Sequence, residues 1–136
     1  MNNKFMLVIF CILSLTISGC SSDKNIEKLD EELFNDGKQI VKLYAKVYNG
    51  DDDSASEASD LVEDFLSSYK NDSNLSESEM QFVYQIEILY LQYRNFMVKS
   101  VSEEISGDSV GESDEFKEEM KNTLLEFKES FGISLE

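Results

Sequence analysis

The sequence predicts an all-α fold, a small antiparallel bundle of about four helices in which the third is the longest and central. Three observations predict it. Apolar side chains recur at steps of three, four or seven residues along most of the chain, which is the spacing of one helix face. Proline is absent from all 136 residues, so no proline ring interrupts a helix from within. No stretch of useful length alternates between apolar and polar residues as a strand would.

The composition bounds the size of the fold and the kinds of partner. With 136 residues the chain has room for one domain, and a hydrophobic fraction of 41% is enough to build a core. Lys and Arg number 12 and Asp and Glu number 28, for a net charge of −16. Such a chain is repelled by nucleic-acid phosphates and by anionic lipid headgroups. The sequence therefore predicts no nucleic-acid partner.

The first two predicted helices lie in the first half of the chain. Apolar periodicity starts at Ile26 and predicts a helix that ends at the stop signal Asn49-Gly50. Gly37 falls inside this helix and costs about 1 kcal/mol relative to alanine, which leaves a break at that position open. After a polar, turn-like stretch, the apolar spacing from Ala58 onward predicts a second helix.

The third predicted helix is the longest and runs from about residue 77 to residue 105. Ser76 and Glu79 form a capping-box pattern at its start. Gly107 follows its end, where a glycine commonly terminates a helix.

A fourth helix is predicted after the next loop, with Ser113 as its N-cap and Gly132 as its stop. Its apolar residues keep helical spacing: Phe116, Met120, Leu124, Phe127 and Phe131. The natural architecture is a four-helix antiparallel bundle, or three helices and a hairpin arm. Residues 25–136 are therefore expected to form one helical bundle domain.

The third predicted helix carries more apolar residues than one buried face requires. At about 100° per residue, one arc contains Phe82, Ile86, Leu89, Tyr93, Phe96 and Met97. On the opposite side, a second line of apolar residues contains Tyr84, Ile88, Leu91 and Val98. The favoured interpretation is that both are buried, with the first two helices on one face and the fourth on the other. The alternative is that the second line stays exposed and binds a partner protein or a second copy of the chain, because tyrosine suits interfaces.

The first twenty residues, MNNKFMLVIFCILSLTISGC, combine one lysine with an apolar run of 13 residues at positions 5–17. A membrane-spanning helix needs about 20 apolar residues, so this run is typical of the core of a signal peptide. The stretch ends in an aliphatic residue, two small residues and a cysteine: Ile17, Ser18, Gly19 and Cys20. This pattern resembles the lipobox of bacterial lipoprotein signal peptides.

The resemblance implies that residues 1–19 are a signal peptide, cut off after Gly19, and that the sulfur of Cys20 takes a diacylglycerol. Residues 20–24 would be the lipidated cysteine and a short tether. The protein would then be anchored by lipid to the bacterial cell membrane and face outside the cytoplasm. The alternatives are an uncleaved anchor helix or an ordinary secretory signal, in which Cys20 would be a plain thiol.

This processing also removes the residue types that most enzymes need. The chain has no histidine, and its two cysteines are Cys11, in the segment that is removed, and Cys20, which would carry lipid. Nucleophilic triads and metal sites with His or Cys ligands are therefore excluded. The acidic run at 51–53 lacks the glycine and the glutamate that an EF-hand loop needs at its sixth and twelfth positions. The sequence predicts no enzymatic activity, no cofactor and no metal site.

The leading hypothesis is a non-enzymatic, lipid-anchored envelope protein that binds another protein, most simply the extracellular part of a membrane protein. In size and anchoring such a protein is similar to exclusion and immunity lipoproteins of phages and conjugative elements, although no motif of the bundle matches them. One alternative is a lipoprotein that holds a small apolar molecule between helices lined by Phe and Tyr. Another is that the released signal peptide acts as a peptide signal.

Overall fold

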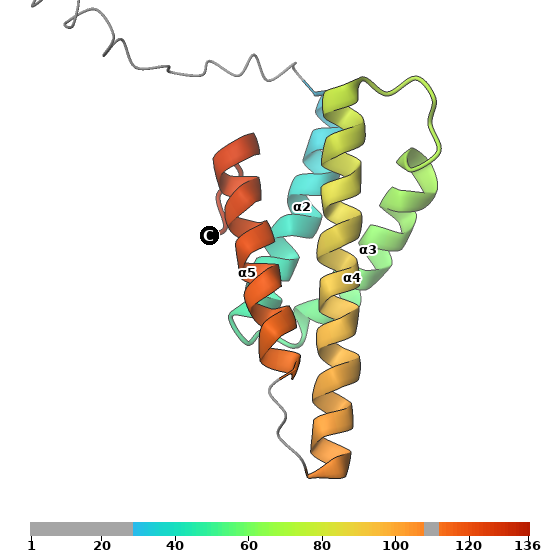
Figure 1. Cartoon of the computed structure of the whole chain (residues 1–136). Helices are drawn as coiled ribbons and strands as arrows, with labels where there is room; N and C mark the ends of the chain where they lie inside the picture. Colours follow the sequence, from blue (N-terminus) through green and yellow to red (C-terminus); the bar gives the residue numbers. More distant parts are fainter. Residues whose placement is uncertain (1–28, 108–111) are drawn as a thin grey trace, which may run out of the picture.

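The protein is described by a computed structural model that covers residues 29–107 and 112–136. These residues form four helices: α2 (Glu31–Tyr48), α3 (Ser54–Tyr69), α4 (Glu77–Ser106) and α5 (Glu112–Phe131). Consecutive helices run in opposite directions, and the part of the chain that the structure describes contains no strand (Figure 1). The predicted all-α bundle of about four helices is confirmed.

Local capping explains where α2 begins. Asp30 is its N-cap, and the Asp30 carboxylate accepts hydrogen bonds from the backbone N–H groups of Glu32 at 3.0 Å and Leu33 at 3.1 Å. The helix therefore starts later than the apolar periodicity predicted, and Leu29 lies outside it. It continues without a break through Gly37 and ends at Asn49, as predicted.

The start of α3 is earlier than the predicted position at Ala58. The Ser54 hydroxyl donates to the Asp51 carboxylate at 2.9 Å, and the Ser54 backbone N–H donates to the Asp51 carbonyl at 3.2 Å. These bonds close a turn in the acidic stretch, and the helix begins at Ser54. The 51–53 run thus works as a turn that leads into a helix.

Both predicted ends of α4 are confirmed. The Ser76 hydroxyl accepts from the Glu79 backbone N–H, and the Glu79 carboxylate accepts in return from the Ser76 backbone N–H at 2.8 Å. Gly107 ends the helix in the left-handed conformation, with φ of 71°.

The prediction that Ser113 is the N-cap of the last helix is wrong, because α5 already includes it. The Ser113 backbone N–H donates to the Glu103 carboxylate at 3.1 Å, and the Ser113 hydroxyl donates to the same carboxylate. Ser113 is buried by this contact. The side chain therefore ties the start of α5 to the last turns of α4.

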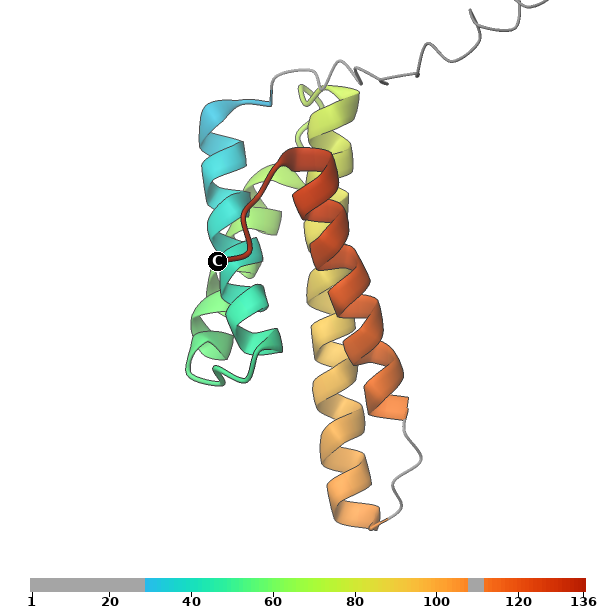
Figure 2. The ribbon, with the colours of Figure 1, turned by 90° about the vertical axis from the view of Figure 1, so that its left-hand side faces the viewer.

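α4 contacts α2, α3 and α5, so the longest helix is also central, as predicted. α2 likewise contacts the other three helices, and α3 and α5 lie on opposite sides of the α2–α4 pair. The last turns of α4 extend past the ends of α2 and α3, where α5 alone runs beside them (Figure 2). One part of α4 is thus enclosed by the bundle, and another part protrudes from it.

An aromatic cluster fills the end of the core near the start of α4. Phe82 is fully buried, and its ring centre lies 5.8 Å from Phe34, 5.9 Å from Phe127 and 4.8 Å from Phe131. The predicted inner arc of α4 supplies its share of the core: Phe82, Val83, Ile86, Leu89 and Tyr93 are buried. Met97 was placed in the same arc but is 41% exposed, because it lies where α4 leaves the bundle.

Candidate functional site

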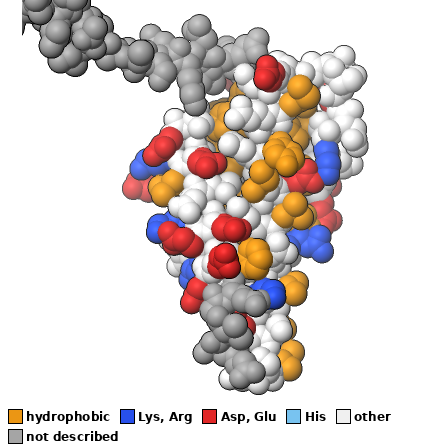
Figure 3. Space-filling model, in the orientation of Figure 1, with side chains coloured by type: hydrophobic (Ala, Val, Ile, Leu, Met, Phe, Trp, Pro, Cys, Tyr) orange, Lys and Arg blue, Asp and Glu red, His pale blue; other side chains and the backbone are white. Residues whose placement is uncertain are grey.

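A line of apolar side chains follows the outer face of α4 from one end of the helix to the other (Figure 3). We call it the α4 stripe, and its members are Met80, Tyr84, Ile88, Leu91, Val98, Val101 and Ile105. Tyr84 is 62% exposed, Leu91 47% and Val98 67%, while Ile88 is half-buried. Most single apolar residues on a surface need no explanation, but a contiguous line of them is typical of a contact surface.

The favoured prediction, that this second line of α4 is buried, is therefore wrong. α2, α3 and α5 together cover the inner arc and flanks of α4, and no described element packs over the stripe. The reason lies in the packing of four helices, since each helix of such a bundle keeps an outer face toward solvent. The structure brings Tyr84, Ile88, Leu91 and Val98 together on one surface, while their role in binding stays a prediction.

Three members of the stripe were not singled out from the sequence: Met80, Val101 and Ile105. Ile105 is 82% exposed, the most of any large apolar residue in the described part of the chain. The sequence spacing could have identified Ile105 as a member of the stripe, because Ile105 stands seven residues after Val98, just as Val98 stands seven after Leu91.

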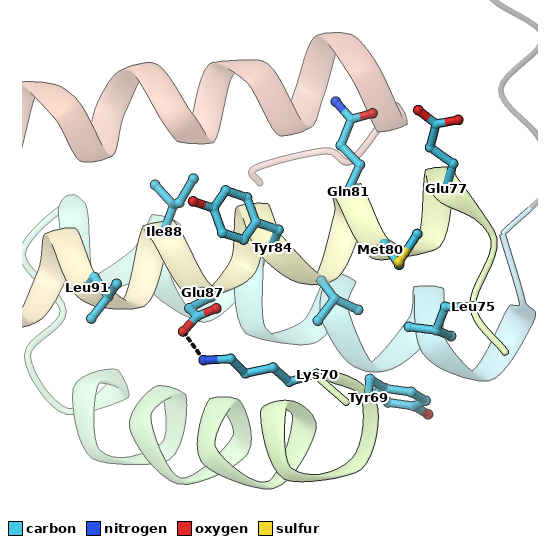
Figure 4. Close-up of a pocket in the computed structure, with 11 residues that line it drawn as sticks. Tyr69, Lys70, Leu75, Glu77, Met80, Gln81, Tyr84, Glu87, Ile88 and Leu91 are labelled. Atoms are coloured by element: carbon cyan, nitrogen blue, oxygen red, sulfur yellow. Dashed lines mark hydrogen bonds and ion pairs between the residues drawn. The ribbon is translucent and has the colours of Figure 1, made fainter. Parts of the chain in front are cut away.

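A groove runs beside the first half of the stripe, between α4 and the end of α3 (Figure 4). It has a volume of about 730 Å³, and its lining includes Tyr69, Lys70, Leu75, Met80, Tyr84 and Leu91. We call it the α3–α4 groove. The Lys70 ammonium donates to the Glu87 carboxylate on one wall, and Figure 4 shows this ion pair pointing across from α3 to α4. The groove is thus an apolar hollow with one ion pair at its edge.

The charges near the α4 stripe are balanced, unlike those of the whole chain. Glu77 and Glu87 are matched by Lys70 in the groove and by Arg94 on α4. The Arg94 guanidinium lies 5.6 Å from the centre of the Tyr90 ring. A molecule with a net charge of −16 therefore presents one face on which the charges largely cancel.

Two tyrosines at the core, Tyr90 and Tyr44, have raised pKa values. The Tyr90 hydroxyl donates to the Glu63 carboxylate at 2.9 Å, and burial together with this bond raises the pKa of Tyr90. Burial also raises the pKa of Tyr44, whose side chain is fully enclosed. Both groups therefore stay protonated at neutral pH, which suits packing rather than proton transfer.

Within the described ranges, the buried polar or charged side chains are Ser54, Ser113 and Thr123. No group of three or more His, Cys, Asp or Glu side chains in these ranges is placed to hold a metal ion. Acid–base catalysis by carboxylates would need two of them sharing a buried cleft. The described residues provide no such pair.

The residues of the predicted lipobox, Ile17, Ser18, Gly19 and Cys20, lie outside the described residues, as do the rest of the predicted signal peptide and the predicted tether. In the part of the chain that is described, no helix has both the length and the apolar character needed to cross a membrane. The chain matches no protein-family model, and it has no significant match among curated proteins or solved structures.

Proposed function

We propose that this chain is a non-enzymatic, lipid-anchored protein of the bacterial envelope that binds another protein through the α4 stripe. The observation that carries the proposal is the line of apolar side chains from Met80 to Ile105 on the outer face of α4, in which the exposed Arg94 and Asn95 stand between Leu91 and Val98. Its composition supports this reading, because interfaces are enriched in Tyr, Met and Arg and depleted in acidic residues at their centres. The stripe offers Tyr84 and Met80, with Arg94 beside them.

The position of the chain's tethered end supports the same proposal. The backbone N–H of Asp30, just before α2, donates to the Glu79 carboxylate at 2.8 Å, which places the start of the bundle beside the start of α4. An anchor at Cys20 would hold this end close to the bilayer, and the stripe would extend from this end for about 38 Å at 1.5 Å per residue. Extracellular parts of a membrane protein lie within that reach.

The proposal can be tested by crosslinking in native membranes. We expect a lysine-reactive crosslinker to capture a specific protein neighbour of the lipidated chain, identified by mass spectrometry. Leu91→Asp should lower the yield of this adduct at least about tenfold, since an apolar contact at the centre of an interface often exceeds 1.4 kcal/mol. Leu91 is 47% exposed, so the free energy of unfolding should change by no more than about 0.5 kcal/mol.

Leu125→Asp on α5 is the matched control, because Leu125 is similarly exposed at 42% but lies off the stripe. It should leave the adduct unchanged. A Leu91→Asp variant that still gives the full adduct would contradict a role for the stripe in binding. A variant that unfolds would contradict its assignment as surface.

A second candidate function is the binding of a small apolar molecule, and the α3–α4 groove favours it. Its volume of about 730 Å³ falls in the usual range of ligand pockets, about 300–1,000 Å³. The groove opens on solvent, whereas the predicted site lay between helices lined by Phe and Tyr. A fluorescent apolar probe should bind the parent chain with saturation at one site. Loss of this binding in the Tyr84→Asp variant would support this candidate.

A further inference from the structure

We infer that the occupant of the α4 stripe is a second copy of this chain, packed antiparallel about a two-fold axis at Leu91. The inference rests on the proposed function, namely that the stripe is a protein-binding surface. Three features of the described residues carry it: the spacing of the stripe, the surroundings of the two halves of α4, and the order of the charges along the stripe.

The spacing is that of a helix which pairs with another helix. Tyr84, Leu91, Val98 and Ile105 follow one another at intervals of seven residues. Met80 stands four residues before Tyr84, and Val101 stands three after Val98, so the alternating steps of a heptad are apolar at both ends, while Glu87 and Arg94 occupy the alternate positions in the middle. This pattern extends over about 38 Å of helix. A seven-residue repeat of this length is typical of helix–helix packing along a seam.

The two halves of α4 differ in what lies beside them. The first half borders the α3–α4 groove, while the last turns protrude past α2 and α3 (Figures 1 and 4). About a two-fold axis at Leu91, Tyr84 faces Val98 of the second copy, because each is seven residues from Leu91. By the same count, Val101 and Ile105 of the second copy reach Gln81 and Glu77, which line the groove. The protruding half of each copy would thus enter the groove of the other.

The order of charges selects the antiparallel arrangement. Glu87 precedes Leu91 by four residues, and Arg94 follows it by three. Antiparallel pairing therefore brings Glu87 of each copy beside Arg94 of the other, once on each side of the axis at Leu91. Parallel pairing in register would instead place Glu87 against Glu87 and Arg94 against Arg94, and like charges directly opposed are unfavourable.

The arrangement is also compatible with two lipid anchors in one membrane. A two-fold axis normal to the bilayer keeps the two Leu29 residues at the same height. The two α4 helices would then lie along the membrane. Nine residues, 20–28, span at most about 30 Å between the lipidated position and Leu29 on each side.

The test is crosslinking with one added cysteine in the full chain, in the membranes of bacteria that produce it. Leu91→Cys should give an adduct of twice the chain's mass with a short thiol crosslinker, because Leu91 meets its own counterpart at the axis. Tyr84→Cys or Val98→Cys alone should give at least about tenfold less, since the counterparts lie about 21 Å apart over fourteen residues. Two differently tagged chains, one with each of these cysteines, should crosslink to each other.

The parent chain, with Cys11 and Cys20 only, measures the background, and Leu125→Cys on α5 controls for random collisions. Equal self-adducts at positions 84, 91 and 98 would overturn the antiparallel pairing in favour of a parallel one. An adduct of Leu91→Cys with a protein of different mass would overturn the second copy while leaving the proposed function standing. Absence of any adduct from all three stripe positions would overturn both.

Discussion

At the scale of single residues, Gly37 shows how closely α2 approaches α4. A Cβ atom at this position would lie 2.4 Å from Cε1 of Phe82 and 2.6 Å from Cδ1 of Ile86. Phe82 cannot move aside easily, because the rings of Phe34, Phe127 and Phe131 surround it. The glycine therefore serves packing rather than a break in the helix.

We predict that Gly37→Ala destabilises the fold although alanine is the better helix former. The gain in helix propensity is about 1 kcal/mol, and overpacking a buried site costs about 1–3 kcal/mol. The free energy of unfolding in urea should fall by up to about 2 kcal/mol. Gly37→Ala combined with Phe82→Leu should recover part of this loss, because the smaller side chain relieves the clash. An alanine variant more stable than the parent would contradict the close approach.

Cys20 is the residue on which the proposed location depends. We predict that Cys20→Ala moves the chain out of the lipid-anchored state. The variant should lose the diacylglycerol mass from its N-terminal peptide, and cell fractionation should show less of the chain in a form extracted only by detergent. Ser21→Ala is the control and should keep both properties. A Cys20→Ala chain that keeps its lipid mass would contradict anchoring at this position.

At the scale of elements, the start of α4 links two helices through one carboxylate. Glu79 accepts hydrogen bonds from the backbone N–H groups of Ser76 and of Asp30, each at 2.8 Å. These bonds hold the pKa of Glu79 below its ordinary value of 4.5, and the bond from the Ser76 backbone has the largest effect. Since its pKa is lower in the folded than in the unfolded chain, Glu79 adds stability above pH 4.5, and the contribution is lost as pH falls through the folded value.

We predict that Glu79→Gln destabilises the fold at neutral pH and much less under acid conditions, where the parent carboxyl is itself protonated. Ser76→Ala should cost about 1 kcal/mol, the usual value for an N-cap. Urea unfolding of the parent and the variants at neutral and at acid pH measures these changes in the free energy of unfolding. Glu77→Gln, at the first residue of the same helix, is the control for a general change of charge. An equal loss at neutral and acid pH would show that the charge of Glu79 contributes nothing.

The start and end of α4 could be predicted from the sequence because they are local. Ser76 and Glu79 are three residues apart, and Gly107 directly follows the helix it ends. The role of Ser113 could not be predicted, because its carboxylate partner Glu103 lies on another helix. Ser113 has the sequence pattern of an N-cap, but its side chain binds the Glu103 carboxylate of another helix instead.

The exposure of the α4 stripe could be predicted from the sequence as an alternative only. The spacing of Tyr84, Leu91 and Val98 identifies a second apolar face, but the spacing does not tell whether another helix covers it. That depends on how the four helices are arranged around α4, which is a property of the whole bundle. The α3–α4 groove has the same origin, since Lys70 and Leu75 come from outside α4.

At the scale of the whole molecule, the chain is an acidic bundle with one apolar face on which the charges largely cancel. The net charge of −16 keeps most of the surface away from anionic partners. The α4 stripe departs from this pattern, because Lys70 and Arg94 offset the acidic residues beside it. Contact with another protein is therefore expected along α4 rather than elsewhere on the described surface.

We expect the α4 stripe to be exposed in the isolated chain and covered by protein in the membrane. Thiol labelling of a Val98→Cys chain tests it most directly, because Val98 is 67% exposed. The parent chain gives the background, and Leu125→Cys gives an exposed site off the stripe. We expect rapid labelling of position 98 in the purified chain at high dilution and at least about tenfold slower labelling in native membranes, with position 125 unchanged. Equal labelling of position 98 in both states, or protection in the purified chain, would contradict it.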